Sequence, residues 1–191
     1  MYKRQPVTKA SDYIFADNDT LETVSVSAAM TDLGDSCFFG CDNITSFSVA
    51  DGNLVYAAQD DILYSKDNTF LIAYPNGKTE KTFTVPDGVE QIGTGAFGYA
   101  KLQSITMPDS VTTINEWAFA YSTLTDVTFS PNITAIYDYA FSYCADMTDW
   151  NLPEKLEYIG NAAFANCTGM AEIKLPESLT TIGMGDFTGT G

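Results

Sequence analysis

Residues 85–107 read VPDGVEQIGTGAFGYAKLQSITM, and the same phrase recurs along most of the chain. Its phenylalanine returns at positions 119, 141, 164 and 187, so successive copies are 22 or 23 residues long. A period of this length predicts a solenoid, in which each copy is one coil that cannot bury its apolar residues alone. We therefore expect one continuous core and no central pocket.

The aromatic position of the repeat is expected to form a buried column along the convex side of the solenoid, with one ring for each coil. Two earlier copies are degenerate, one at residues 33–38 and the end of another at residues 15–26. The repeat positions are Phe38, Phe97, Phe119, Phe141, Phe164 and Phe187.

Each copy ends in alternating apolar and polar residues, which is typical of a strand with one buried face. Consecutive coils run in the same direction, so the sequence predicts one parallel, concave sheet of about seven short strands. The predicted strands are residues 23–26, 46–49, 82–85, 104–107, 126–129, 149–152 and 172–175.

A column of residues that tolerate positive φ follows the second apolar position of each copy and predicts a turn there. Gly34, Gly93, Gly160 and Gly183 occupy it, together with Asn115. The residue in this column of the remaining copy is Tyr137, where we expect strain or a different turn.

Residues 50–84 form a copy that is longer than one coil. Two β-rich runs, Ile62–Ser65 and Phe70–Tyr74, flank the turn-forming residues 66–69. This arrangement predicts a β-hairpin inserted into the solenoid.

Residues 152–167, LPEKLEYIGNAAFANC, resemble the BspA-like leucine-rich repeats of bacterial surface proteins. The resemblance extends over residues 15–187, and the columns of Pro, Ile-Gly, Ala-Phe and Cys make it specific. It implies a right-handed, β-rich leucine-rich-repeat solenoid on the cell surface or outside the cell. The copy at 50–84 is similar to a hairpin-bearing repeat of that family, although Asp61 stands where glycine is common and leaves the turn type open.

The sequence predicts a short N-terminal segment, residues 1–14, and a single solenoid, residues 15–191. Within the first segment, Tyr2-Lys3-Arg4-Gln5 is what a transposon end used in sequencing would encode, so residues 1–5 are interpreted as an artefact. The chain enters and leaves in the middle of a repeat. We therefore expect further repeats or domains of the same protein beyond both ends.

The composition argues against several classes of function. The formal net charge is −16, with a single arginine and no basic stripe, so we expect no nucleic-acid partner. No apolar run is long enough to predict membrane insertion. Histidine is absent, and no phosphate loop or metal motif accompanies the carboxylates, so we expect neither enzymatic activity nor a cofactor.

The four cysteines are interpreted as buried thiols. Cys41, Cys144 and Cys167 lie three residues after the repeat phenylalanine, in a column that also accepts Ala100 and Ser122. Such a column is a small core slot, and free cysteine is among the most buried residue types. A disulfide between Cys144 and Cys167 on adjacent coils is the less favoured alternative, and a zinc site is disfavoured further.

The exposed side of the predicted sheet is the candidate ligand face. Asp126, Asp149 and Glu172 share one column, where like charges on adjacent strands repel unless they are solvated or bridged by a cation. A solvated face, a ligand contact surface and a weak calcium site all remain open. The candidate residues are Ser104, Thr106, Asp126, Thr128, Asp149, Asn151, Glu172 and Lys174.

A second surface feature is aromatic. Tyr99, Tyr121 and Tyr143 share one column, with Trp117 and Tyr139 in a neighbouring one. Packing between coils is favoured over a glycan platform for this ladder.

Together these features favour a binding or adhesion module that recognises a protein or a glycan, host-derived ligands included, through one face of the solenoid. The alternative is a structural stalk that spaces another domain from the cell. The sequence does not identify the ligand.

Overall fold

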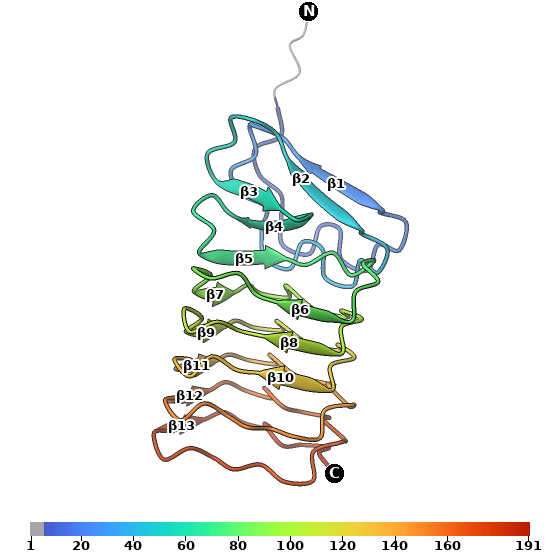
Figure 1. Cartoon of the computed structure of the whole chain (residues 1–191). Helices are drawn as coiled ribbons and strands as arrows, with labels where there is room; N and C mark the ends of the chain where they lie inside the picture. Colours follow the sequence, from blue (N-terminus) through green and yellow to red (C-terminus); the bar gives the residue numbers. More distant parts are fainter. Residues whose placement is uncertain (1–5) are drawn as a thin grey trace, which may run out of the picture.

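The computed structural model describes residues 6–191 as a β-solenoid whose coils stack from the N-terminal to the C-terminal end (Figure 1). The residues interpreted as a sequencing artefact, 1–5, lie outside the described part. Within residues 6–191 the regular structure consists of strands, with no helix. This confirms the predicted β-rich solenoid.

Three sheets run along the solenoid. In the first, β1 (Thr23–Val26) pairs in parallel with β2 (Ser46–Val49). In the second, β8 (Ser104–Thr106) lies between β6 (Thr82–Thr84) and β10 (Asp126–Thr128), both parallel to it. The third has the order β13-β12-β11-β9-β7-β5-β4-β3. Its strands are β3 (Tyr56–Gln59), β4 (Ile62–Ser65), β5 (Phe70–Ala73), β7 (Gln91–Ile92), β9 (Thr113–Ile114), β11 (Ala135–Ile136), β12 (Tyr158–Ile159) and β13 (Thr181–Ile182).

Five of the seven predicted strands are present, as β1, β2, β6, β8 and β10, whereas residues 149–152 and 172–175 form no strand. The prediction of one sheet was wrong, since these five strands lie in two separate sheets, β1-β2 and β6-β8-β10. The buried indole of Trp150 fills the place that Ile105 and Val127 occupy in the two coils before it. The amide of Leu152 then donates to the carbonyl of Trp150 in its own coil, at 3.1 Å. The extended pairing therefore ends at β10.

The predicted hairpin is confirmed and is part of a larger insertion. β4 and β5 are antiparallel, as expected, and β3 pairs with β4 through a second turn at Asp60 and Asp61. These two residues have φ of 51° and 67°, which is the geometry of a type I′ hairpin turn. Since β5 pairs in parallel with β7, the insertion continues the third sheet.

The core contains the predicted phenylalanine column. Phe97, Phe119, Phe141 and Phe164 are fully buried, and their ring centroids follow one another at 5.0, 4.9 and 5.7 Å with nearly parallel planes. Phe187 continues the column at 6.1 Å and is only partly buried. Phe38 is also buried but stacks on Phe15 instead, because Tyr74 of the hairpin repeat packs against Phe97 at 5.1 Å.

The glycine column was interpreted wrongly in most coils. Gly34 has positive φ, but Gly93, Asn115, Tyr137, Gly160 and Gly183 do not. A Cβ on Gly160 would lie 2.6 Å from the carbonyl carbon of Tyr137, and one on Gly93 would lie 2.6 Å from the carbonyl oxygen of Leu71. These positions therefore require glycine because the backbone of the preceding coil leaves no room for a side chain. The amide of Tyr137 donates to the carbonyl of Ile114 in the preceding coil, just as the amide of Gly160 donates to the carbonyl of Ile136. The turn at Tyr137 is therefore the same as in the other coils.

Positive φ occurs instead two residues before and two residues after the inward phenylalanine, in each of seven coils. The residues before it are Tyr13, Ser36, Gly95, Trp117, Tyr139, Ala162 and Gly185. The residues after it are Asp17, Gly40, Tyr99, Tyr121, Tyr143, Asn166 and Gly189. The chain therefore makes the same arch over every phenylalanine.

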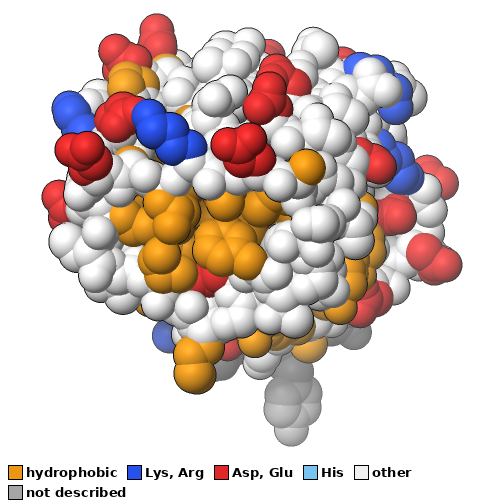
Figure 2. All heavy atoms as spheres, turned by 90° about the horizontal axis from the view of Figure 1, so that it is seen from below, with side chains coloured by type: hydrophobic (Ala, Val, Ile, Leu, Met, Phe, Trp, Pro, Cys, Tyr) orange, Lys and Arg blue, Asp and Glu red, His pale blue; other side chains and the backbone are white. Residues whose placement is uncertain are grey.

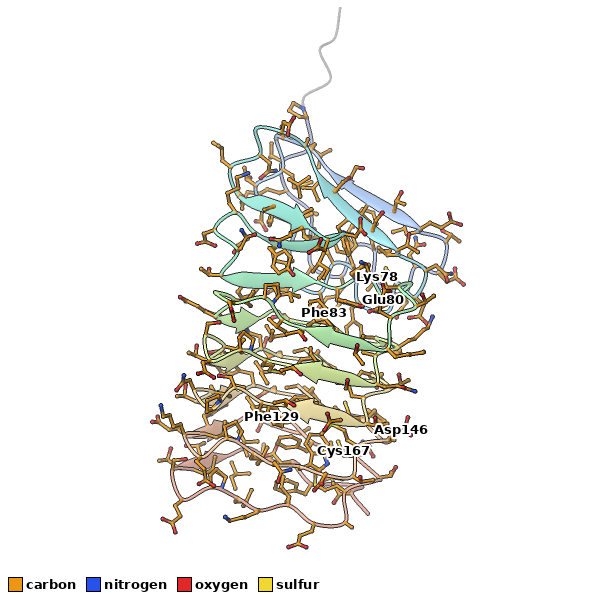
Figure 3. All side chains as sticks on the ribbon, in the orientation of Figure 1. Lys78, Glu80, Phe83, Phe129, Asp146 and Cys167 are labelled. Atoms are coloured by element: carbon orange, nitrogen blue, oxygen red, sulfur yellow. The ribbon has the colours of Figure 1, made fainter. Side chains whose placement is uncertain are left out.

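The cysteines are buried, free thiols, as favoured from the sequence. Cys144 donates to the carbonyl of Phe119, and Cys167 to that of Phe141, each at 3.1 Å in the preceding coil. Figure 3 shows Cys167 among the lower coils of the stack, below Phe129. The thiols therefore add polar contacts between coils without a covalent link.

Hydrophobic side chains are exposed at the C-terminal end of the stack. Leu175, Ile182 and Met184 are 40%, 44% and 83% exposed. The view from below in Figure 2 shows a hydrophobic area on this end, bordered by charged side chains.

Candidate functional site

The strand face is the exposed side of β6, β8 and β10 together with residues 149–152 and 172–175. Seven of the eight candidate residues are exposed, and Ser104 is half-buried. Strand pairing places Asp126 beside Ser104 and Thr128 beside Thr106. The predicted columns are therefore in register over β8 and β10, but Asp149, Asn151, Glu172 and Lys174 lie on segments without ladder hydrogen bonds.

A recess opens on the strand face where the ladder ends. It holds about 450 Å³ of space continuous with solvent, and Asn151 and Lys174 line it together with Glu154. Trp150, Leu152 and Pro176 form its apolar wall. The recess therefore combines an amide, a carboxylate and an ammonium group with an apolar wall.

Trp150 takes an inward position of the repeat, which indicates a core residue, and the structure confirms this with 3% exposure. Its indole contacts Phe141 and Phe164 edge-on, at 5.5 and 4.9 Å, and its Nε1 has no hydrogen-bond partner. The recess lies beside this indole, where the strand ladder has ended.

The arch face is a second surface, formed by the six-residue arches around the inward phenylalanines. Its segments are residues 12–17, 35–40, 94–99, 116–121, 138–143, 161–166 and 184–189. Backbone hydrogen bonds tie the arches from 94–99 to 161–166 to one another at every second residue. The amides of Gly95, Phe97 and Tyr99 donate to carbonyls of the next coil at 2.9, 2.7 and 2.9 Å. Side chains on this face therefore project from a rigid ladder.

Two aromatic ladders lie on the arch face. Tyr99, Tyr121 and Tyr143 stack at 4.7 and 4.5 Å, with planes within 9° of parallel. Trp117 stacks on Tyr139 at 4.2 Å.

Phe39, which sequence reasoning missed, joins the two ladders. It contacts Tyr99 edge-on at 5.3 Å and Trp117 at 6.2 Å. Because Phe39 sits beside a repeat phenylalanine, only the arch geometry reveals its contacts.

The three tyrosines of the ladder adopt a left-handed backbone conformation, with positive φ, that bulky residues disfavour. A left-handed conformation costs a bulky residue about 1–2 kcal/mol, whereas glycine and asparagine adopt it readily. Three tyrosines therefore cost about 3–6 kcal/mol, and two stacked pairs return about 1–3 kcal/mol beyond their buried area. The same arch closes with Gly40, Asn166 and Gly189 in other coils. The fold does not require tyrosine at this position.

The arch face is acidic as well as aromatic. It carries no lysine or arginine in any of its seven segments. Burial chiefly, and then Tyr121, Asp17 and Asp42, raise the pKa of the Tyr99 hydroxyl. The carboxylates of the arch segments are Asp12, Asp17, Asp35, Glu116, Asp138 and Asp186, of which only Asp186 is buried.

In the part of the chain that the structure describes, no three acidic or cysteine side chains gather as a metal site would require. Over the same residues, no helix has the length and apolar character needed to cross a membrane.

Comparison with solved structures places this architecture among bacterial leucine-rich proteins. A leucine-rich cell surface protein from Faecalibacterium prausnitzii is 30% identical, with a TM-score of 0.86 over 96% of this chain and 49% of that one. The pneumococcal vaccine antigen PcpA shares the fold at 20% identity, with a TM-score of 0.85 over 97% of this chain and 49% of that one. The chain thus spans about half the length of these two proteins. No curated protein matches the sequence.

The sequence also matches the family described as the BspA type leucine-rich repeat region, in six copies over residues 3–68 and 73–190. These segments include nearly the whole solenoid. The chain therefore belongs to the BspA-type leucine-rich repeat family.

Proposed function

We propose that this chain is a binding module of a bacterial surface protein, and that it recognises a protein or a glycan through its strand face. The recess is the observation that carries the proposal. It brings Asn151 and Lys174, from two coils, to one recess with an apolar wall and polar groups of both hydrogen-bonding types. Polar groups placed beside an apolar surface can fix the orientation of a ligand.

The strand face also has the rigidity that favours binding. Side chains on β8 and β10 are held in register, so few degrees of freedom are lost when a ligand binds. The similarity to a cell surface protein supports the location of such a module outside the cell.

A triple variant tests this proposal. Replacing Asp126, Asp149 and Glu172 with lysine reverses the charge of the strand face and touches no core residue. We expect it to abolish binding on a protein and glycan array, with the circular dichroism spectrum and melting temperature unchanged or improved, since like-charge repulsion is relieved.

The matched control reverses Asp60 and Asp61, both exposed at the hairpin turn. Because Lys78 approaches Asp61 at 3.4 Å, this control also reports whether a surface charge change of similar kind disturbs the fold. Loss of binding in the control alone would move the site to the hairpin. A parent protein that binds nothing on the array would contradict a binding module and favour a stalk.

A further inference from the structure

The two aromatic ladders of the arch face end in the same coil, at Tyr139 and Tyr143. Trp117 covers one face of Tyr139, and Tyr121 covers one face of Tyr143. The next coil has small residues at both positions, Ala162 and Asn166. The opposite ring faces of Tyr139 and Tyr143 therefore have no aromatic neighbour, and Tyr143 is 45% exposed.

These two ring faces lie four residues apart on one arch, on either side of the buried Phe141. Hydrogen bonds from the amides of Tyr139, Phe141 and Tyr143 to the next coil, at 2.9, 2.8 and 2.8 Å, hold the arch in place. The pair of rings is therefore preorganised, and binding would not have to order it.

The charges on this face select the kind of partner. Five of its carboxylates reach the surface, and no cationic side chain of the arch segments neutralises them. Lys101 lies outside the arch and donates to the backbone carbonyl of Asp42. The face of an aromatic ring attracts cations, and neighbouring carboxylates add to this attraction.

We propose that the arch face binds a cationic peptide segment, with an arginine or lysine side chain against the ring faces of Tyr139 and Tyr143 that have no aromatic neighbour. Glu116 is exposed, follows directly before Trp117 in the chain and attracts the charge of the peptide, whereas both carboxylate oxygens of Asp138 accept hydrogen bonds from Asn161. This site is separate from the strand face, and neither proposal depends on the other.

The fold offers a variant that removes a ring without straining the arch. Tyr143→Asn installs the residue that the next coil carries at the same left-handed position. The melting temperature should stay the same or rise, because asparagine tolerates positive φ. Tyr143→Phe keeps the ring face and removes only the hydroxyl.

The probe is a fluorescent peptide of repeated Gly-Ser-Arg, with Gly-Ser-Gln of equal length as its neutral counterpart. We expect the parent to bind the arginine peptide more tightly than the glutamine peptide, and more weakly as ionic strength rises. Tyr143→Asn should weaken arginine-peptide binding about tenfold, and Tyr143→Phe should retain it. Glu116→Gln should weaken binding and reduce its dependence on salt, while Thr128→Ala on the strand face should change neither.

Three results would overturn the proposal. The first is equal affinity of the parent for the two peptides. The second is unchanged arginine-peptide binding by a folded Tyr143→Asn variant. The third is capture of a neutral glycan that Tyr143→Asn abolishes while peptide binding persists, which would make the face a sugar site. Because the strand-face variants are measured separately, failure here leaves the proposed function untouched.

Discussion

Truncation of Phe141 to alanine tests the stacked core. Its ring is fully buried and contacts four aromatic neighbours, two by stacking and two edge-on. Removing a buried phenylalanine costs about 3–5 kcal/mol, and each aromatic pair adds about 0.5–1.5 kcal/mol beyond area burial. We expect a loss in the upper half of the first range, since coils on both sides prevent collapse around the void.

Urea unfolding followed by circular dichroism and by tryptophan fluorescence gives the free energy of unfolding, and coincident transitions would justify a two-state treatment. For a chain of this size the loss should lower the melting temperature by roughly 8–20 °C. Phe187→Ala is the matched control. It has one stacked partner, 6.1 Å away, and is only partly buried, so it should cost about 1–2 kcal/mol. A loss under about 1 kcal/mol for Phe141→Ala would refute the coil register.

Other parts of the account can be tested on the same protein. Cys144 and Cys167 should resist alkylation at pH 8 until the chain unfolds, because burial raises the pKa of the Cys144 thiol to about 12 and also raises the pKa of the Cys167 thiol; rapid labelling of the folded protein would contradict this. Gly160→Ala should lower the free energy of unfolding by about 1–3 kcal/mol, since the new Cβ would meet backbone atoms of the preceding coil; an unchanged urea midpoint would show that the coils separate at no cost. Millimolar calcium should barely change the melting temperature, because the strand face supplies one carboxylate per coil in the Asp149 column; a large stabilisation that Asp149→Ala removes would reveal a site.

The core could be predicted because a repeat multiplies a weak signal. A single Ala-Phe step says little, but a phenylalanine that returns at 97, 119, 141 and 164 can only be buried by stacking coils. The hairpin was predictable for a similar reason, since two β-rich runs around a turn are local features. The strand β3, which pairs across Asp60 and Asp61, lacks such a run and was missed.

The glycine column shows where sequence patterns are ambiguous. Glycine is selected both by positive φ and by close approach of another chain segment, and the two cannot be separated without coordinates. Gly95 has positive φ, whereas Gly93, two residues earlier, is placed by contact with Leu71.

The candidate surfaces were only partly predictable. The columns on β8 and β10 follow from strand periodicity and register. The recess lies beside Trp150, where the strand ladder has ended, and the end of the ladder has no periodic signature in the sequence. The acidic border of the aromatic ladders emerges only when arches distant in sequence are stacked.

Carboxyl footprinting with mass spectrometry measures the central claim most directly, because the three competing surfaces each carry exposed carboxylates. The protein would be labelled with a carbodiimide and an amine, with and without the ligand that the array identifies. Binding through the strand face predicts protection of Asp126 and Asp149, with the labelling of Asp60 and Glu116 unchanged. Equal labelling of Asp126 and Asp149 in the free and bound protein would contradict the account.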